Sequence, residues 1–369
     1  MSDYYVGLMS GTSMDGIDAA LVSFGDANVD IHATHSEPYP KDLKDALLTA
    51  IREPLDVALD PSGELDRKVG ERFRDAALAV IDKSGVTRRE IVAIGSHGQT
   101  LRHQPNAIEP FSLQIGNAKI IATGTSTTTV ANFREADIAA GGQGAPLVPP
   151  FHQWLFGSED NNRVVVNIGG IANITVLPAG GSGVLGLDTG PGNGLMDAWV
   201  SRHLGESFDR AGEWAASGTV IGSLLDEFCG DPYFKLHAPK STGFEYFNPN
   251  WLQSFDVDRF DPADVQATLC ELSAATIAIA INEYTENTQE VFVCGGGVHN
   301  TELMRRLGQR LSGATVRSTL TAGLDPDWVE AAAFAWLAMR TKNRQTGNLP
   351  DVTGATHKVV LGDIHSPLP

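Results

Sequence analysis

Short apolar runs alternate along the chain with longer segments in which apolar residues recur at helical spacing. In the N-terminal part the runs Tyr4–Leu8, Ala19–Phe24 and Ile91–Ser96 predict buried strands. The spacing within Lys41–Ile51 and Glu64–Lys83 predicts two helices. Strands alternating with helices of this length are typical of the α/β class.

The C-terminal part follows the same pattern. Further strands are predicted at Arg163–Ile168, Ile171–Leu177, Val184–Leu187 and Glu290–Cys294, and further helices at Asn193–Leu204, Ala263–Tyr284, Thr301–Leu311 and Trp328–Arg340. A strand, a glycine-containing turn and a second strand occur near the start of each part, which indicates a loose internal repeat. Two such hairpins facing each other would suit a charged ligand, although glycine turns are also ordinary in hairpins.

The length and composition of the chain limit the classes of function that it can have. A chain of 369 residues is longer than one compact core usually holds, so two domains are expected. The formal charge of −18 makes nucleic acid or an anionic membrane a poor partner. Three cysteines without CxxC spacing favour neither disulfides nor zinc. The N-terminus shows no signal-peptide pattern, and the apolar tract Ala274–Ile281 is too short to span a bilayer, so a cytoplasmic soluble protein is expected.

The turn between the first two strands could bind phosphate. Its glycines allow close approach to the backbone, and its hydroxyl side chains and backbone N–H groups are donors. Asp15 and Asp18 would repel a bare phosphate, so a cation between them and the ligand is expected, and Mg²⁺ suits few carboxylates with phosphate oxygens. A plain hairpin turn capped by its own side chains is the alternative. The chain has no GxxxxGK[ST] motif and is therefore not a P-loop enzyme.

Two further glycine clusters follow predicted strands. The turn Asn167–Asn173 directly follows a buried apolar run, which would hold its backbone rigidly. The segment Cys294–Asn300 leads from a strand into a helix, where a nucleotide could lie against the backbone. Each is also compatible with a structural turn. The GxGxxG order of dinucleotide-binding folds is not reproduced.

Asp188 stands in the sequence Leu187–Asn193, which we expect to be a glycine- and proline-stiffened loop after a strand. An acid at a strand end is placed to act as a general base, whereas a turn-forming or helix-capping role is the common alternative. An aspartic protease would need two DTG loops and is excluded, because only one occurs.

Several polar residues near the predicted strand ends could contact a sugar-like ligand. His97 and Gln99 follow the strand Ile91–Ser96, and Arg134, Asp137 and Gln143 surround the glycine- and proline-rich stretch Ala139–Pro150, a hinge or a substrate-lining loop. Glu330 lies at the start of an apolar helix, where an acidic side chain usually interacts favourably with the helix dipole.

Taken together, these motifs resemble the anhydro-N-acetylmuramic acid kinase family over essentially the whole chain. The matching stretches, in order, are Gly7–Asp18, Ser96–Thr100, Ala139–Pro149, Asn167–Asn173, Leu187–Asn193, Cys294–Asn300 and Asn348–Gly354. Several long motifs in the right order are far more specific than any one glycine loop. Asn132 departs from the pattern, which has Asp at this place.

The resemblance implies two ribonuclease-H-like α/β domains of the sugar kinase, heat-shock protein and actin superfamily, with an interdomain cleft. We expect residues 1–131 with 343–369 to form the first domain and residues 132–342 the second. The implied ATP-binding residues are Gly11, Thr12, Ser13, Met14, Asp15, Gly16, Ile17, Asp18, Asn167, Gly169, Gly170, Gly295, Gly296, Gly297 and Asn300. The implied substrate-binding residues are Ser13, His97, Gln99, Arg134, Gln143 and Glu330, with Asp188 as the catalytic base and Asp15 as the metal ligand.

The resemblance further implies a reaction in which water opens 1,6-anhydro-N-acetylmuramic acid and ATP phosphorylates the released 6-oxygen. Its cofactors would be ATP and Mg²⁺, and the protein would be a cytoplasmic homodimer working in peptidoglycan recycling. Two alternatives remain at this point: an ordinary sugar or acetate-type kinase acting on a free hydroxyl, and a nucleotide-switched binding module.

Overall fold

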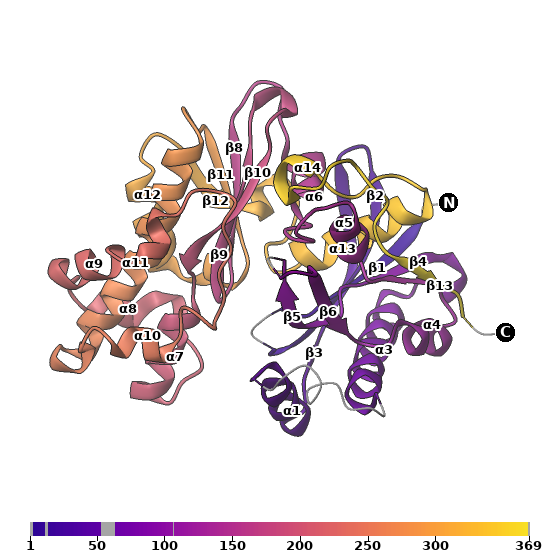
Figure 1. Cartoon of the computed structure of the whole chain (residues 1–369), viewed down its shortest axis with the longest axis horizontal. Coiled ribbons are helices and arrows are strands. Elements are labelled where there is room, and N and C mark those ends of the chain that lie inside the picture. The colour runs from indigo at the N-terminus through magenta and orange to yellow at the C-terminus, as the bar shows by residue number, and fades with distance from the viewer. Residues whose placement is uncertain (1–2, 12–13, 53–62, 106, 368–369) are drawn as a thin grey trace. The chain divides into compact units, whose positions relative to one another are not determined.

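The computed structural model describes residues 3–11, 14–52, 63–105 and 107–367. The chain divides into two compact units (Figure 1). Unit 1 contains residues 1–155 and 328–369, and unit 2 contains residues 156–327. Because the two segments of unit 1 lie before and after residues 156–327, unit 2 is a continuous insertion into unit 1. Each unit has its own hydrophobic core.

Unit 1 is built on a six-stranded sheet in the order β13-β7-β4-β1-β2-β3. Its strands are β1 (Tyr4–Met9), β2 (Gly16–Gly25), β3 (Asn28–Pro38), β4 (Ile91–Ser96), β7 (Thr129–Ala131) and β13 (Asp363–His365). Strands β1 to β3 are antiparallel, while β4 is parallel to β1 and β7 is parallel to β4. The hairpin of β5 (Gln99–Gln104) and β6 (Phe111–Ile115) forms a separate two-stranded sheet.

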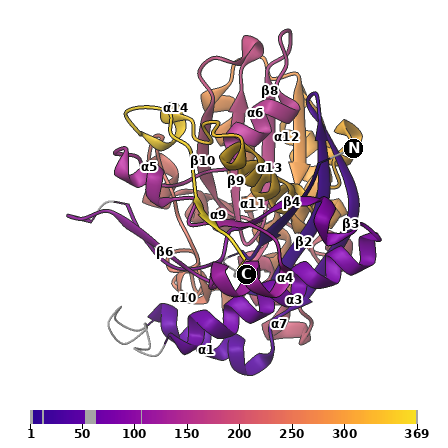
Figure 2. The ribbon, with the colours of Figure 1, turned by 90° about the vertical axis from the view of Figure 1, so that its right-hand side faces the viewer.

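The helices of unit 1 are α1 (Lys41–Arg52), α3 (Glu64–Ser84), α4 (Ala118–Thr125), α5 (Glu135–Ala139), α6 (Pro149–Phe156), α13 (Val329–Lys342) and α14 (Pro350–Thr353), with the short 3₁₀ helix η1 (Arg88–Glu90). Helices α3 and α13 pack on opposite faces of the sheet. Val6 and Leu8 of β1 share a core cluster with Phe73 of α3. Gly7 lies between them and therefore faces the other way, where a Cβ would come within 1.7 Å of the Ala331 carbonyl oxygen of α13. Figure 2 shows α3 and α4 side by side on their face of the sheet.

Unit 2 repeats the strand arrangement of unit 1. Its sheet has the order β10-β9-β8-β11-β12, from β8 (Arg163–Ile168), β9 (Ile171–Leu177), β10 (Leu185–Pro191), β11 (Glu290–Cys294) and β12 (Thr315–Ser318). Three antiparallel strands are again followed by two strands parallel to the first, in the same order as β3-β2-β1-β4-β7. The loose repeat in the sequence therefore corresponds to a repeated sheet topology.

The helices of unit 2 pack around α11 (Pro262–Tyr284). The others are α7 (Gly194–Leu204), α8 (Glu213–Ser217), α9 (Gly222–Cys229), α10 (Pro249–Gln253) and α12 (Thr301–Arg310), with 3₁₀ helices η2 (Ala179–Gly181), η3 (Arg210–Gly212), η4 (Pro232–Lys235), η5 (Val257–Arg259), η6 (Gly296–His299) and η7 (Thr319–Ala322). By length and hydropathy α11 could cross a membrane, but 83% of its apolar window is buried in the structure. It is the central core helix of unit 2 rather than a short apolar tract.

The structure differs from the sequence-based expectations in two places that bear on the site. The expected domain boundaries at residues 131 and 342 lie inside unit 1, because the buried carboxylate of Asp137 accepts hydrogen bonds from Asn348 and Thr353, and α13 packs on β1 and β4. The expected loop around Asp188 is part of strand β10, because Asp188 pairs with Asn173 of β9. The bounds expected for β8, β9 and β11 agree with the structure.

Candidate functional site

Asp188 lies in β10 at an irregularity of its pairing with β9, where the register shifts between Asp188 and Gly190. Two segments far along the chain hold it. The Thr242 backbone N–H donates to the Asp188 carboxylate at 2.9 Å, and the Tyr233 hydroxyl donates to the Asp188 carbonyl at 2.8 Å. The carboxylate is therefore fixed in direction with only one hydrogen bond from protein among the described residues.

This environment changes the acidity of Asp188. Burial raises its pKa from 3.8 to about 6, with the negative charge of Glu245 adding to the rise, while the Thr242 hydrogen bond and Lys240 oppose it. The cause is the loss of water around the ionised form. A carboxylate with a pKa near neutrality can take a proton from water more readily than an ordinary aspartate.

Three glycine-rich segments of unit 2 meet at the ends of their strands. The N–H groups of Gly192 and Gly194 donate to the Gly170 carbonyl oxygen at 2.9 and 3.0 Å. A Cβ on Gly295 would come within 2.3 Å of the Asn167 side-chain oxygen, and one on Gly297 within 2.3 Å of the Ile168 side chain. The turn at Gly169–Gly170 and the loop at Gly295–Gly297, both expected to bind nucleotide, are thus neighbours within unit 2.

Asn300, which the sequence predicts to bind ATP, also caps a helix in the structure. Its side-chain oxygen accepts from the Leu303 N–H at 2.9 Å and so caps the N-terminus of α12. Its side-chain oxygen also lies against the Gly212 backbone, where a Cβ would come within 2.1 Å. Contact with a nucleotide would have to use the remaining amide group of Asn300.

The β1–β2 turn of unit 1 contains the residues expected to hold phosphates. Thr12 and Ser13 lie outside the described residues. Met14 has a left-handed backbone with φ of 51°, and its side chain and that of Ile17 belong to the unit 1 core. Of the residues that remain, Gly11 and Gly16 offer backbone atoms alone. Nucleotide contacts from these four residues would therefore be made through the backbone.

The buried side chain of Gln99 holds the same turn through hydrogen bonds. Its side-chain oxygen accepts from the Ser10 hydroxyl at 2.7 Å, and its side-chain nitrogen donates to the Gly11 carbonyl at 3.2 Å. Gln99 is fully buried. The sequence predicts a substrate contact for Gln99; the structure shows that its side chain shapes the turn.

His97 and Arg134 form a buried pair in unit 1. The Arg134 guanidinium donates to His97 Nε2 at 2.7 Å and to the Gly144 carbonyl at 2.8 Å. Burial and the charge of Arg134 lower the pKa of His97 to about 3, so the ring is neutral at physiological pH. Burial also lowers the pKa of Arg134 to about 10, and the negative charge of Glu330 opposes that change.

The other expected sugar contacts lie on the same unit. Gln143 is held by its backbone N–H, which donates to the Thr353 carbonyl at 2.8 Å. The loop around it is anchored to Asp137, which accepts from the Gly144 N–H at 2.8 Å. Within unit 1 the structure thus brings together His97, Arg134 and Glu330, and fixes the loop that carries Gln143.

Tyr233 and Thr242 were not identified from the sequence as parts of the site. They lie 45 and 54 residues beyond Asp188 and reach it only through the fold. No local pattern marks either residue, because one is used through its hydroxyl and the other through its backbone. Asn132 donates to the carboxylates of Glu135 and Asp363, which the aspartate expected here from the resemblance could not do.

The β1–β2 turn offers a donor set compatible with Mg²⁺. The exposed Asp15 carboxylate has one oxygen in an ion pair with Lys44 at 2.8 Å, and Asp18 accepts from the Ser36 hydroxyl. No group of three or more His, Cys, Asp or Glu side chains suited to a metal ion lies in the described part of the chain. One carboxylate beside phosphate oxygens and water is the mode of binding that Mg²⁺ prefers, so Asp15 fits.

Comparison with known proteins identifies the family. The family model described as anhydro-N-acetylmuramic acid kinase matches residues 3–367. The chain belongs to this family. It is 50% identical over 363 residues to the anhydro-N-acetylmuramic acid kinase of Shewanella loihica, with 98% of each chain covered. It is 47% identical over 363 residues to that of Coxiella burnetii, covering 98% of this chain and 97% of the relative.

A solved structure shares the fold at much lower sequence identity. Component A of the (R)-2-hydroxyglutaryl-CoA dehydratase of Acidaminococcus fermentans aligns with a TM-score of 0.50 and 12% identity, over 93% of this chain and 100% of that one. The likeness supports the expected fold class, which the repeated sheet topology of the two units also carries. The protein therefore shares its two-unit α/β fold with this solved structure.

Proposed function

We propose that this protein uses ATP to phosphorylate 1,6-anhydro-N-acetylmuramic acid while adding water to its internal acetal. The products are N-acetylmuramate 6-phosphate and ADP. Membership of the family over residues 3–367 is the observation that carries the proposal. The raised pKa of Asp188 supports the proposal, because the addition of water needs a general base.

The reaction makes two bonds at one sugar. A water oxygen bonds to the anomeric carbon as the bond from that carbon to the 6-oxygen breaks. The released 6-oxygen bonds to the γ-phosphorus of ATP, and ADP leaves. One proton of the water passes to a base, and the other remains on the new anomeric hydroxyl, so atoms and charge balance.

We assign the proton transfer to Asp188. Its raised pKa leaves the carboxylate ionised at neutral pH yet basic enough to accept a proton in the transition state. The Thr242 N–H and the bulged strand hold the carboxylate in one direction. A positioned general base contributes about 10²–10⁴-fold to such a step.

Backbone N–H groups would position the triphosphate. In unit 2 the proposed contacts are Asn167, Gly169, Gly170 and Gly295–Gly297, with Asn300 beside them, and in unit 1 the β1–β2 turn from Gly11 to Asp18. Asp15 would hold Mg²⁺, which supplies positive charge to the phosphate oxygens when it is bound. Excluding bulk water from the site would limit wasteful ATP hydrolysis.

The sugar would be held by unit 1 through Ser13, His97, Gln99, Arg134, Gln143 and Glu330. The neutral His97 and the charged Arg134 are already joined by a hydrogen bond. Arg134 would therefore meet the polar sugar with its donors fixed in direction rather than free to rotate. We further propose that the enzyme is a cytoplasmic homodimer that acts in peptidoglycan recycling.

The decisive experiment follows the atoms of water. The protein is incubated with the anhydro-sugar and Mg-ATP in ¹⁸O-water, and the phosphorylated product is analysed by mass spectrometry. We expect one ¹⁸O on the anomeric carbon and none in the phosphate. Phosphorylation of free N-acetylmuramate in preference to the anhydro-sugar would instead indicate an ordinary sugar kinase. ATP hydrolysis without phosphosugar would indicate a nucleotide-switched module.

A further inference from the structure

The buried carboxylate of Asp137 joins parts of unit 1 that lie far apart in the sequence. One of its oxygens accepts from the side chains of Asn348 and Thr353, both at 2.7 Å, and these residues lie 211 and 216 positions further along the chain. The other oxygen accepts from the Gly144 backbone N–H at 2.8 Å. Asp137 has no exposed surface, and these three donors are uncharged. A carboxylate removed from water in this way depends on its hydrogen bonds, so each donor is held in a defined place.

The glycine-rich loop Ala139–Pro149 packs closely around this carboxylate. A Cβ on Gly142 would come within 2.2 Å of a carboxylate oxygen of Asp137, so only glycine lets the loop pass at this distance. Gly144, whose N–H the carboxylate accepts, has a left-handed backbone with φ of 69°. The glycines of this stretch therefore allow a close contact with Asp137.

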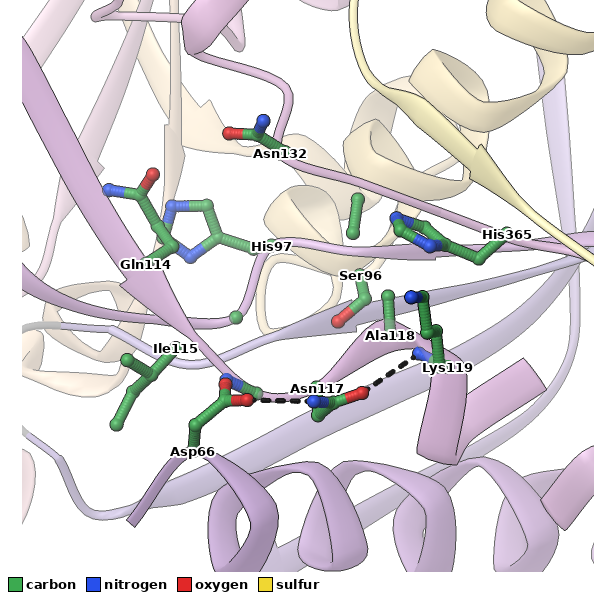
Figure 3. Close-up of a pocket in the computed structure, with 13 residues that line it drawn as sticks. Asp66, Ser96, His97, Gln114, Ile115, Asn117, Ala118, Lys119, Asn132 and His365 are labelled. Carbon is green, nitrogen blue, oxygen red and sulfur yellow. Dashed lines mark hydrogen bonds between the residues drawn. The ribbon is translucent and has the colours of Figure 1, made fainter. Parts of the chain in front are cut away.

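The same loop holds a side chain that we expect to bind the sugar. The Gly144 carbonyl accepts from the Arg134 guanidinium at 2.8 Å, so Asp137 binds the N–H of Gly144 while Arg134 binds its carbonyl. Arg134 also donates to His97 Nε2 at 2.7 Å, and His97 lies directly after β4 in the wall of a cavity of unit 1 (Figure 3). The position of the Arg134 guanidinium therefore depends on a backbone segment that Asp137 fixes.

The C-terminal segment Asn348–Gly354 binds the loop directly as well. The Gln143 N–H donates to the Thr353 carbonyl at 2.8 Å. Figures 1 and 2 show α14, which ends at Thr353, close to α5, which carries Asp137. The segment is one of the stretches that match the family pattern, yet none of its residues is among the expected ATP or sugar contacts. Its hydrogen bonds to Asp137 and Gln143 indicate what the segment does.

We propose that Asp137, Asn348 and Thr353 form a positioning unit, which fixes Arg134 and Gln143 for contact with the sugar without touching the sugar itself. This inference rests on the proposed function and gives the C-terminal segment a part in it. Loss of one donor would leave the buried carboxylate partly unpaired, and the loop would have to shift to compensate. The expected ATP contacts lie in other segments, so the effect should be confined to the sugar.

The test removes one hydroxyl group and keeps the approximate size of the side chain. Thr353→Val deletes a donor to Asp137, whereas Asp137→Ala would risk unfolding the protein. The KM values of the anhydro-sugar and of ATP are measured by steady-state kinetics, with the melting temperature of each variant in parallel. We expect the KM of the sugar to rise about tenfold and that of ATP to change less than about twofold. Thr353→Ser, which keeps the hydroxyl, should keep the KM of the sugar close to that of the unaltered protein.

The matched control is Thr125→Val in α4, because the buried Thr125 hydroxyl donates at 2.7 Å to the Ile121 carbonyl of its own helix. This variant should keep both KM values. A lower melting temperature with unchanged KM values in Thr353→Val would indicate a purely structural role and overturn the positioning unit. Equal rises in the KM of the sugar and of ATP would overturn it too. If the unaltered protein forms no phosphosugar, the proposed function itself fails, and this inference fails with it.

Discussion

Asp188 shows how one residue acquires its chemistry from its surroundings. Its carboxylate is partly buried in a strand, faces the charge of Glu245 and receives one backbone hydrogen bond. Taking an ionised carboxylate out of water raises its pKa, here to about 6. The same burial that makes Asp188 a better base also makes its ionised form unfavourable in the folded protein.

The first consequence is a pH dependence of turnover. A general base works only when it is ionised, so kcat should rise with pH and level off above about pH 7, with a midpoint near the pKa of Asp188, about 6. The variant Asp188→Asn should still bind ATP but lose at least about 10²-fold in kcat. Steady-state kinetics from pH 5 to 8, with ATP binding measured by calorimetry, check both. A variant that keeps its turnover would exclude Asp188 as the base.

The second consequence is a gain in stability when the charge is removed. The folded protein binds this proton more tightly than the unfolded chain, so stability falls as pH rises from 3.8 to about 6 and stays lower above it. Asp188→Asn removes that cost, and we expect unfolding at pH 8 to require up to about 3 kcal/mol more free energy than in the unaltered protein. The gain should shrink at pH 5. Melting temperatures at the two pH values test this, and an equal change at both would contradict it.

At the scale of elements, glycine lets a helix cross a sheet closely in unit 1. Gly7 of β1 and Gly95 of β4 both face α13, and a Cβ on Gly95 would come within 2.0 Å of the Phe334 carbonyl oxygen. The obstacle is backbone and cannot move as a side chain could. The absence of side chains at Gly7 and Gly95 therefore sets the distance between α13 and the sheet. It also sets the position of Glu330, which lies in the first turn of that helix.

Gly95→Ala should accordingly destabilise the protein by about 3 kcal/mol or more, because α13 must move away from the sheet. The matched control is Gly308→Ala in α12, where nothing lies within 4 Å of the new Cβ. That change should stabilise by about 0.5–1 kcal/mol through the higher helix propensity of alanine. Urea denaturation of both variants checks the signs. Equal stability of the two would mean that the close approach in unit 1 is not rigid.

At the scale of the whole molecule, the chain makes two units of one topology but builds them differently. Unit 2 is one continuous segment with its own core, whereas unit 1 needs α13 from the far end of the sequence to cover β1 and β4. Figure 1 shows α13 against the strands β1 and β4 of the N-terminal part. Unit 1 therefore needs residues that follow unit 2 in the chain to complete its fold.

This difference predicts unequal behaviour of two fragments. Residues 156–327 alone should fold and unfold in one cooperative transition, because they hold a complete core. Residues 1–155 alone should not, because without α13 one face of their sheet is left uncovered. Circular dichroism during thermal unfolding distinguishes the two. A cooperative transition in the fragment 1–155 would show that α13 is dispensable for the core of unit 1.

Much of the local structure was predictable from the sequence. Buried runs such as Arg163–Ile168 and Glu290–Cys294 predict strands whose bounds the structure confirms. Strand β3 was missed because its residues are largely exposed or half-buried and give no apolar run. The place of Asp188 within β10 was missed because the glycines and proline after it indicate a turn, whereas pairing with β9 holds the segment extended.

By itself, the amino-acid sequence determined the alternation of strands and helices, the loose repeat and the family, since all three depend on residues close together or on motifs in order along the chain. Only the tertiary structure decided the shared strand order of the two units, the assignment of α13 to unit 1 and the surroundings of Asp188. It also decided which residues surround the buried carboxylate of Asp137. These features depend on contacts between residues tens to hundreds of positions apart, and burial, pKa and cavity shape exist only once such contacts have formed.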